Sequence, residues 1–111
     1  MGLEIKQDNT TAFVGVQDEM TIYTVALHWD QLSPLLAQVK AMELDLSAVT
    51  EIDSAGVQLL LALKQESTRL HNRFELCRPN DGVVELLQLL RLEQALPVAA
   101  GVSGQEAVCN G

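Results

Sequence analysis

The sequence contains few of the residues from which most enzymatic and metal sites are built. Its 111 residues include two cysteines, Cys77 and Cys109, and two histidines, His28 and His71. These form no Cys-x-x-Cys or His-x-x-x-His spacing, so a structural zinc site is not expected. The Walker loop, the Gly-x-Gly-x-x-Gly fingerprint and the Gly-x-Ser-x-Gly motif are all absent. We therefore expect a binding or switching module with no enzymatic activity, no cofactor and no metal.

Basic residues and long apolar runs are also scarce. Seven Lys and Arg stand against fifteen Asp and Glu, which gives a formal net charge of -8. Nucleic acids and anionic lipids bind to basic surfaces, so neither is expected as the main partner. The apolar run Leu59–Leu63 is far shorter than the ~20 residues of a membrane span, and no direct membrane insertion is expected. The N-terminus lacks the basic and then apolar layout of a secretion signal, which favours a cytoplasmic protein.

Length and composition fit a single folded domain. A chain of 111 residues has the size of one domain, and 48% apolar with 20% charged residues is typical of a globular protein. We expect this domain over residues 1–100. Residues 101–111, rich in Gly, Ser and Asn, predict a flexible C-terminal tail.

Four segments have the pattern of β-strands. Residues 12–16 are a short apolar run and residues 21–25 are β-branched and aromatic, so together they predict a hairpin closed by a polar turn. Residues 42–46 alternate between apolar and polar positions, as a half-buried strand does. Residues 74–77 predict one more short strand.

Helical periodicity begins near Thr24 and returns after residue 53. Two interpretations of the first helix stay open: either Thr24 caps a helix that Pro34 kinks, or Ser33 and Pro34 begin a shorter helix. A long apolar helix is predicted over residues 54–70.

A third helix is predicted after residue 80, where either Asn80 or Asp81 can serve as its N-cap. A hairpin followed by alternating helices and strands predicts an α/β fold, because helical crossovers make the later strands parallel. We expect a mixed sheet of about four to five strands with three or more α-helices packed on it.

Residues 44–57 carry the clearest functional signal. Asp53 stands where a helix N-cap is expected, and its carboxylate can accept free backbone N–H groups there. Ser54 follows at the positive end of the helix dipole, and Gly56 removes a Cβ where another backbone could approach. A phosphate on Ser54 would be stabilised by the dipole and by free N–H donors.

The order of elements, together with Leu-Asp-Leu-Ser at 44–47 and Ile-Asp-Ser-Ala-Gly-Val at 52–57, resembles the STAS domain, the fold of bacterial anti-sigma factor antagonists. The resemblance covers residues 12–98. Residues 20–24, Met-Thr-Ile-Tyr-Thr, also resemble the second strand of STAS proteins found alongside chemotaxis genes.

The resemblance implies a phosphorylation switch in signal transduction and transcription regulation. Ser54 would be phosphorylated by an anti-sigma factor that is also a serine kinase, and a phosphatase would reset it. The partner surface would consist of five consecutive residues: Asp53, Ser54, Ala55, Gly56 and Val57. Ala55 departs from the commonest family pattern, which has a second serine there, and leaves the phosphoacceptor in place.

A rival function exists within the same family. The sequence is similar to the STAS subunit of the bacterial phospholipid-transporting ABC complex, which binds its ATPase subunit without a phosphorylation cycle. Ser54 would then be a helix-start and interface residue only.

Other residues have plainer interpretations. Tyr23 and Trp29 are expected to pack in the core, and Cys77 is expected to be buried on its strand. The acidic residues near the motif predict either a negative patch or an ordinary solvated surface: Glu43, Asp45, Glu51 and Asp53.

Overall fold

The computed structural model describes residues 2–92 and 94–96, and the sequence folds there into four strands and three helices. The elements in chain order are β1 (Leu3–Gln7), β2 (Thr11–Val16), α1 (Val25–Leu36), β3 (Ala41–Asp45), α2 (Ser54–Arg69), β4 (Arg73–Cys77) and α3 (Asp81–Leu89). The predicted α/β class, with its mixed sheet and three helices, is confirmed. The expected tail over residues 101–111, and the domain boundary before it, lie outside the described residues.

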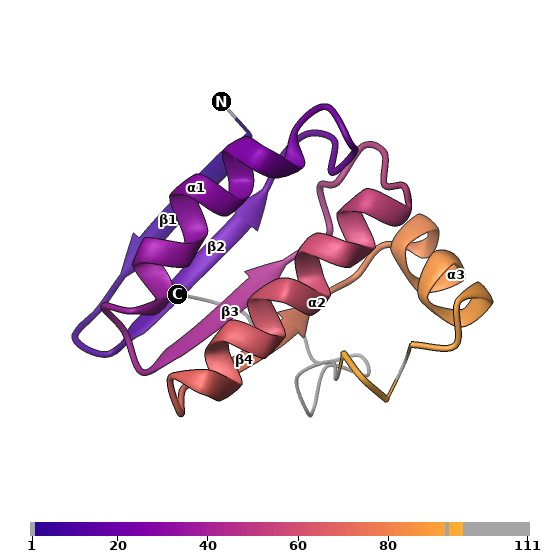
Figure 1. Ribbon diagram of the computed structural model, residues 1–111. Helices are drawn as coiled ribbons and strands as arrows, with labels where there is room; N and C mark the ends of the chain where they lie inside the picture. Colours follow the sequence, from indigo (N-terminus) through magenta and orange to yellow (C-terminus); the bar gives the residue numbers. More distant parts are fainter. Residues whose placement is uncertain (1, 93, 97–111) are drawn as a thin grey trace.

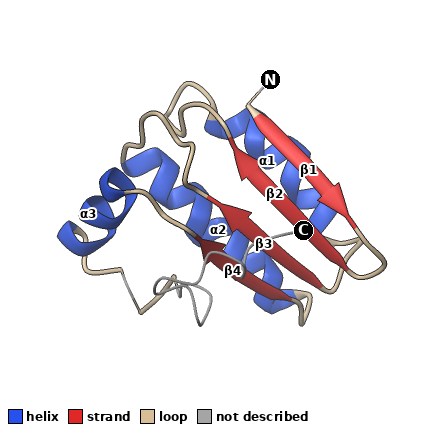
Figure 2. Cartoon of the chain, turned by 180° about the vertical axis from the view of Figure 1, so that it is seen from behind, coloured by secondary structure: helices blue, strands red, loops and turns tan. Residues whose placement is uncertain are grey.

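The sheet has the order β1-β2-β3-β4. The first pair is antiparallel and the two following pairs are parallel. α1 and α2 lie side by side over one face of the sheet, as Figure 1 and the reverse view in Figure 2 show. The apolar core lies between these layers, and it includes Val14, Leu44, Leu60, Leu63 and Phe74, all almost inaccessible to solvent.

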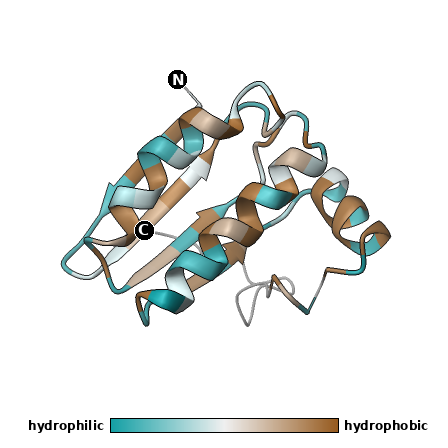
Figure 3. Cartoon of the chain, in the orientation of Figure 1, coloured by the Kyte–Doolittle hydropathy of each residue, from teal (hydrophilic) through white to brown (hydrophobic). Residues whose placement is uncertain are grey.

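The helices bury one side each and expose the other. In Figure 3, α2 alternates between hydrophilic and hydrophobic colours along its length, the pattern of a helix with one face on a core. No helix in the described part of the chain is long and apolar enough to cross a membrane.

The predicted hairpin of residues 12–16 with 21–25 is wrong. β2 pairs with β1, a strand that was not predicted, because its alternation of apolar and polar residues covers only Leu3 to Lys6. Residues 21–24 form a turn, so the resemblance of residues 20–24 to a second strand is also not confirmed.

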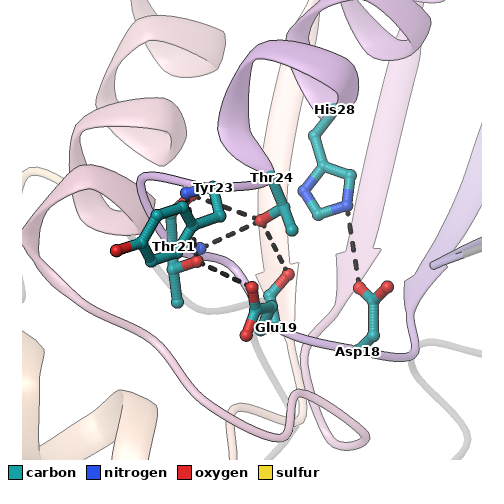
Figure 4. A network of polar contacts seen from close by, with 6 residues as sticks. All are labelled: Asp18, Glu19, Thr21, Tyr23, Thr24 and His28. Carbon is teal, nitrogen blue, oxygen red and sulfur yellow. Dashed lines mark hydrogen bonds and ion pairs between the residues drawn. The ribbon is translucent and has the colours of Figure 1, made fainter.

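Threonine hydroxyls explain this turn, because they bond the local backbone in place of a neighbouring strand. The Thr24 hydroxyl accepts a hydrogen bond from the Thr21 N–H at 3.0 Å and donates one to the carbonyl of Glu19 at 2.9 Å. The Thr21 hydroxyl accepts one from the Tyr23 N–H at 3.2 Å. Figure 4 shows these side chains converging below the start of α1.

The helix boundaries follow the sequence more closely. α1 begins after Thr24, as the first interpretation proposed, although the Thr24 side chain makes no cap hydrogen bond, and Pro34 lies in the last turn of the helix. The side chain of Asp53 caps α2. Asn80, and not Asp81, caps α3, because its Oδ1 accepts the Val83 N–H at 3.0 Å.

Candidate functional site

The candidate site lies where the chain leaves the carboxyl ends of β2 and β3. The segments after these two strands run side by side, joined by a parallel bridge between Met20 and Ile52. The Met20 N–H donates to the carbonyl of Glu51 at 2.8 Å, and the Asp53 N–H donates to the carbonyl of Met20 at 3.3 Å. The start of α2 is therefore held against the segment that leads into α1.

Asp53 reinforces this connection with its side chain. One carboxylate oxygen accepts the Gly56 N–H at 3.1 Å, and the other accepts the Ile22 N–H at 3.2 Å. Partial desolvation alone would raise the pKa of Asp53, but hydrogen bonds from Gly56, Ile22 and Ala55 outweigh it and hold the pKa below the ordinary value. The carboxylate thus stays charged and ties two loops together in addition to capping the helix.

Gly56 is where the two segments approach most closely. A Cβ on this residue would overlap the carbonyl oxygen of Met20 and would lie 2.9 Å from Cγ1 of Ile52. Gly56 is buried, so its lack of a side chain serves the packing of α2 against the neighbouring loop.

Ser54 has the opposite environment. It is exposed at the first position of the 16-residue helix α2. Its hydroxyl has no hydrogen-bond partner in residues 2–92 and 94–96. His28, a buried residue of α1, has Nε2 3.8 Å from the Asp18 carboxylate and does not bond to Ser54. The serine is therefore accessible to a modifying enzyme.

The predicted partner surface therefore needs a correction. Gly56 and Val57 are both buried, so neither residue is exposed to a partner in this conformation. Ala55 is half-buried and Ser54 is exposed. The amphipathic turn of α2 decides this, since residues 56 and 57 point toward the sheet and the loop.

Exposed apolar side chains before and at the start of α1 lie beside Ser54 instead. Ile22 is 67% exposed, Tyr23 is 87% exposed and Leu27, in the first turn of α1, is 60% exposed. The Ile22 N–H bond to Asp53 brings this group beside the start of α2. The expectation that Tyr23 packs in the core is wrong, whereas Trp29 does pack against it. We call Ile22, Tyr23, Leu27 and Ser54 the Ser54 surface.

The expected acidic patch is smaller than the sequence suggested. Asp45 is bonded to Arg78, and Glu43 lies 3.9 Å from Arg73 on the sheet. Desolvation and the neighbouring Glu75 raise the pKa of Glu43, and Arg73 offsets this only in part. Glu51 and Asp53 alone among the four predicted residues lie on the loop beside Ser54.

A cleft of about 370 Å³ adjoins this loop on the side of α3. Its lining comes from residues 49–52 and from Asn80, Asp81 and Gly82. The Asn80 amide donates to the carbonyl of Val49 at 2.8 Å. The same side chain therefore caps α3 and holds the start of this helix against the loop at residue 49. Within the described ranges no group of three or more His, Cys, Asp or Glu could hold a metal ion.

Comparison with known proteins identifies the family. A family model described as "Mlab, STAS domain" matches residues 3–98. The chain belongs to the STAS domain family. No curated protein matches the sequence.

Solved structures share the STAS fold at low sequence identity. The anti-sigma factor antagonist SpoIIAA in its unphosphorylated form is 19% identical, with a TM-score of 0.74 over 89% of each chain. The Bacillus cell fate determinant SpoIIAA in its phosphorylated form is 18% identical, with a TM-score of 0.69 over 89% of this chain and 92% of that one. An anti-sigma factor antagonist from Mycobacterium paratuberculosis is 19% identical, with a TM-score of 0.78 over 96% and 92%. These similarities establish the fold.

Proposed function

We propose that this STAS domain is a cytoplasmic bacterial switch that binds a serine-kinase anti-sigma factor and is controlled by phosphorylation of Ser54. The observation that carries the proposal is the exposed Ser54 hydroxyl, free of partners among the described residues, at the start of α2. The chain itself catalyses nothing in this scheme. The partner kinase transfers the γ-phosphoryl group of ATP to Ser54 Oγ and releases ADP and the hydroxyl proton, and a phosphatase hydrolyses the phosphoserine with water to serine and inorganic phosphate.

The Ser54 surface suits such a partner when the serine is unmodified. Its three large apolar side chains are exposed together, and apolar or aromatic groups of this kind are enriched in the centres of protein interfaces. A neutral hydroxyl beside them can be buried at little cost.

Phosphorylation would change the charge of the surface and leave the fold intact. A phosphoserine carries about -1.5 to -2 charges, which the N-terminus of α2 stabilises in solvent. At a desolvated interface the same charge, next to the ionised Asp53, is costly to bury. The partner is then released. SpoIIAA, which shares the fold, has been solved in both phosphorylated and unphosphorylated forms.

The test compares tagged wild-type protein with Ser54→Ala and Ser54→Asp in pull-downs from native lysate, with mass spectrometry of the retained proteins. We expect Ser54→Ala to retain a serine kinase as wild type does, and Ser54→Asp to lose it. Gln65→Asp is the matched control, because it adds the same charge to an exposed position three turns along α2. The purified kinase with ATP should phosphorylate wild type and not Ser54→Ala.

The melting temperature separates the switch from a structural role. The Ser54 hydroxyl bonds nothing in the described structure, so the free energy of unfolding of Ser54→Ala should lie within about 0.5 kcal/mol of the wild-type value. Its melting temperature should therefore be close to that of wild type. Equal binding of the kinase by Ser54→Asp and wild type would refute the proposed switch, and a large loss of stability in Ser54→Ala would make Ser54 a structural residue.

A second candidate function rests on the name of the matched family model, Mlab, and on the resemblance to the STAS subunit of a phospholipid-transporting ABC complex. In that case the Ser54 surface binds an ABC ATPase permanently. The same pull-down distinguishes the two, because it would recover an ATPase with its membrane partner and no kinase.

A further inference from the structure

β1 is an edge strand whose outer side has no neighbouring strand among the described residues. The sheet order places it at one end, paired only with β2. Figure 2 shows this edge on the side of the sheet away from α2 and α3. An open edge presents unpaired backbone donors and acceptors and can pair with another strand.

The hydrogen-bond pattern identifies the groups that point outward. The Gly2 carbonyl accepts the Gln17 N–H at 2.6 Å, and the Asp8 N–H donates to the Thr11 carbonyl at 3.0 Å. Backbone direction alternates along an antiparallel strand, so even-numbered residues of β1 bond to β2. The N–H and C=O groups of Leu3, Ile5 and Gln7 therefore face outward.

The side chains alternate as well. Ile5 is opposite the buried Val14, so it lies on the helix side of the sheet, yet it remains 43% exposed because β1 is the edge strand of the sheet. Glu4 and Lys6 lie on the other face, and both are exposed.

The order of these residues is self-complementary. If two copies of β1 run antiparallel with Ile5 opposite Ile5, the outward groups of Leu3 meet those of Gln7 in reciprocal hydrogen bonds. The same register sets each Glu4 opposite the Lys6 of the other copy. A parallel in-register arrangement would instead place Lys6 against Lys6.

We propose that the protein forms a symmetric homodimer through β1, in which two four-stranded sheets join into one continuous sheet about a two-fold axis at Ile5. The contact is a short strand pair with one exposed isoleucine from each copy, smaller than the interfaces of permanent dimers. The dimer is therefore reversible and concentration-dependent. It leaves Ser54 itself free, since Ser54 begins α2 and the β1 edge is at the far side of the sheet from α2.

The test measures the mass of the protein in solution by sedimentation velocity at rising concentration. Wild type is expected to pass from monomer to dimer. Lys6→Glu sets Glu opposite Glu4 at two places in the dimer, and Glu4→Lys sets Lys opposite Lys6 at two places. Each variant should raise the dissociation constant of the dimer about tenfold. The double variant Glu4→Lys with Lys6→Glu exchanges the charges, restores both ion pairs and should dimerise as wild type does.

Ile5→Pro tests the backbone contact. The Ile5 N–H points away from β2, so proline there removes no hydrogen bond of the monomer, and proline is tolerated at such edge positions. The variant should keep its fold by circular dichroism and stay monomeric. In wild type, exchange of the Ile5 amide should slow as concentration rises, and exchange of the Ser54 amide should not change.

A wild type that remains monomeric at every concentration would overturn the dimer. A wild-type dimer that persists in Lys6→Glu and Ile5→Pro would show that a different surface associates and would overturn the β1 assignment. Both results are independent of the pull-down that tests the phosphorylation switch.

Discussion

Replacing Gly56 by alanine tests the packing that creates the site. Alanine normally stabilises a helix by about 1 kcal/mol relative to glycine. Here its methyl group would overlap the Met20 carbonyl oxygen and approach Ile52 Cγ1 to 2.9 Å. The obstruction is backbone, so the loop and the first turn of α2 must separate.

The expected effect is a clear destabilisation. Overpacking against a fixed group costs about 3 kcal/mol at the upper end of the usual range, and the helix propensity of alanine offsets about 1 kcal/mol of it. The net loss of about 2 kcal/mol corresponds to a fall of roughly 8–16 °C in Tm for a domain of this size. Separation would also lengthen the Asp53 hydrogen bond to the Met20 carbonyl, which is already 3.3 Å.

Gly82→Ala is the matched control. Gly82 is also in the first turn of a helix, but it is exposed and its new Cβ would meet only the Asn80 side chain, at 3.6 Å. This variant should gain about 0.5–1 kcal/mol. Urea unfolding followed by circular dichroism measures both. A Gly56→Ala protein as stable as wild type would show that the loop yields freely and that the close approach is not needed to hold the site.

Two further predictions concern polar groups around the same end of the sheet. Asn80→Ala should lower the free energy of unfolding by about 2 kcal/mol in urea titrations, because it removes both the α3 cap and the bond to the Val49 carbonyl. Asn80→Asp keeps the cap acceptor and should lose about half as much; equal losses would contradict separate roles for the two bonds. Burial lowers the pKa of His28 below the ordinary 6.5, and Asp18 offsets this only in part, so the unfolded chain binds a proton more readily than the folded one. The free energy of unfolding of wild type should therefore fall as the pH drops below 6.5, by at most about 1.4 kcal/mol per pH unit. His28→Leu should lack this contribution in denaturant titrations at several pH values. Identical pH profiles for the two proteins would show that His28 does not titrate in this range.

Local sequence patterns predicted the elements that rest on strong, nearby signals. The strict alternation before residue 46 marked β3, Asp53 marked the start of α2, and Asn80 with Asp81 marked the start of α3 to within one residue. The motif around Ser54 is also a short local pattern. Its resemblance to the STAS family is confirmed by the family model, which matches residues 3–98. Nothing in these patterns required knowledge of distant contacts.

The errors arose where distant partners or competing local bonds decide the structure. Residues 21–24 are β-branched and aromatic, as a strand should be, but their hydroxyls bond the turn and leave no neighbouring strand for them. β1 has a short apolar and polar alternation, but that pattern does not show that β2 would lie beside it.

The sequence by itself determined the fold class, the start of α2 and the serine at its head, because caps and periodicity act within a few residues along the chain. Only the tertiary structure decided which residues form the surface around that serine. It buried Gly56 and Val57 and exposed Ile22 and Tyr23, since a backbone contact across more than thirty residues sets how α2 packs against the loop before α1.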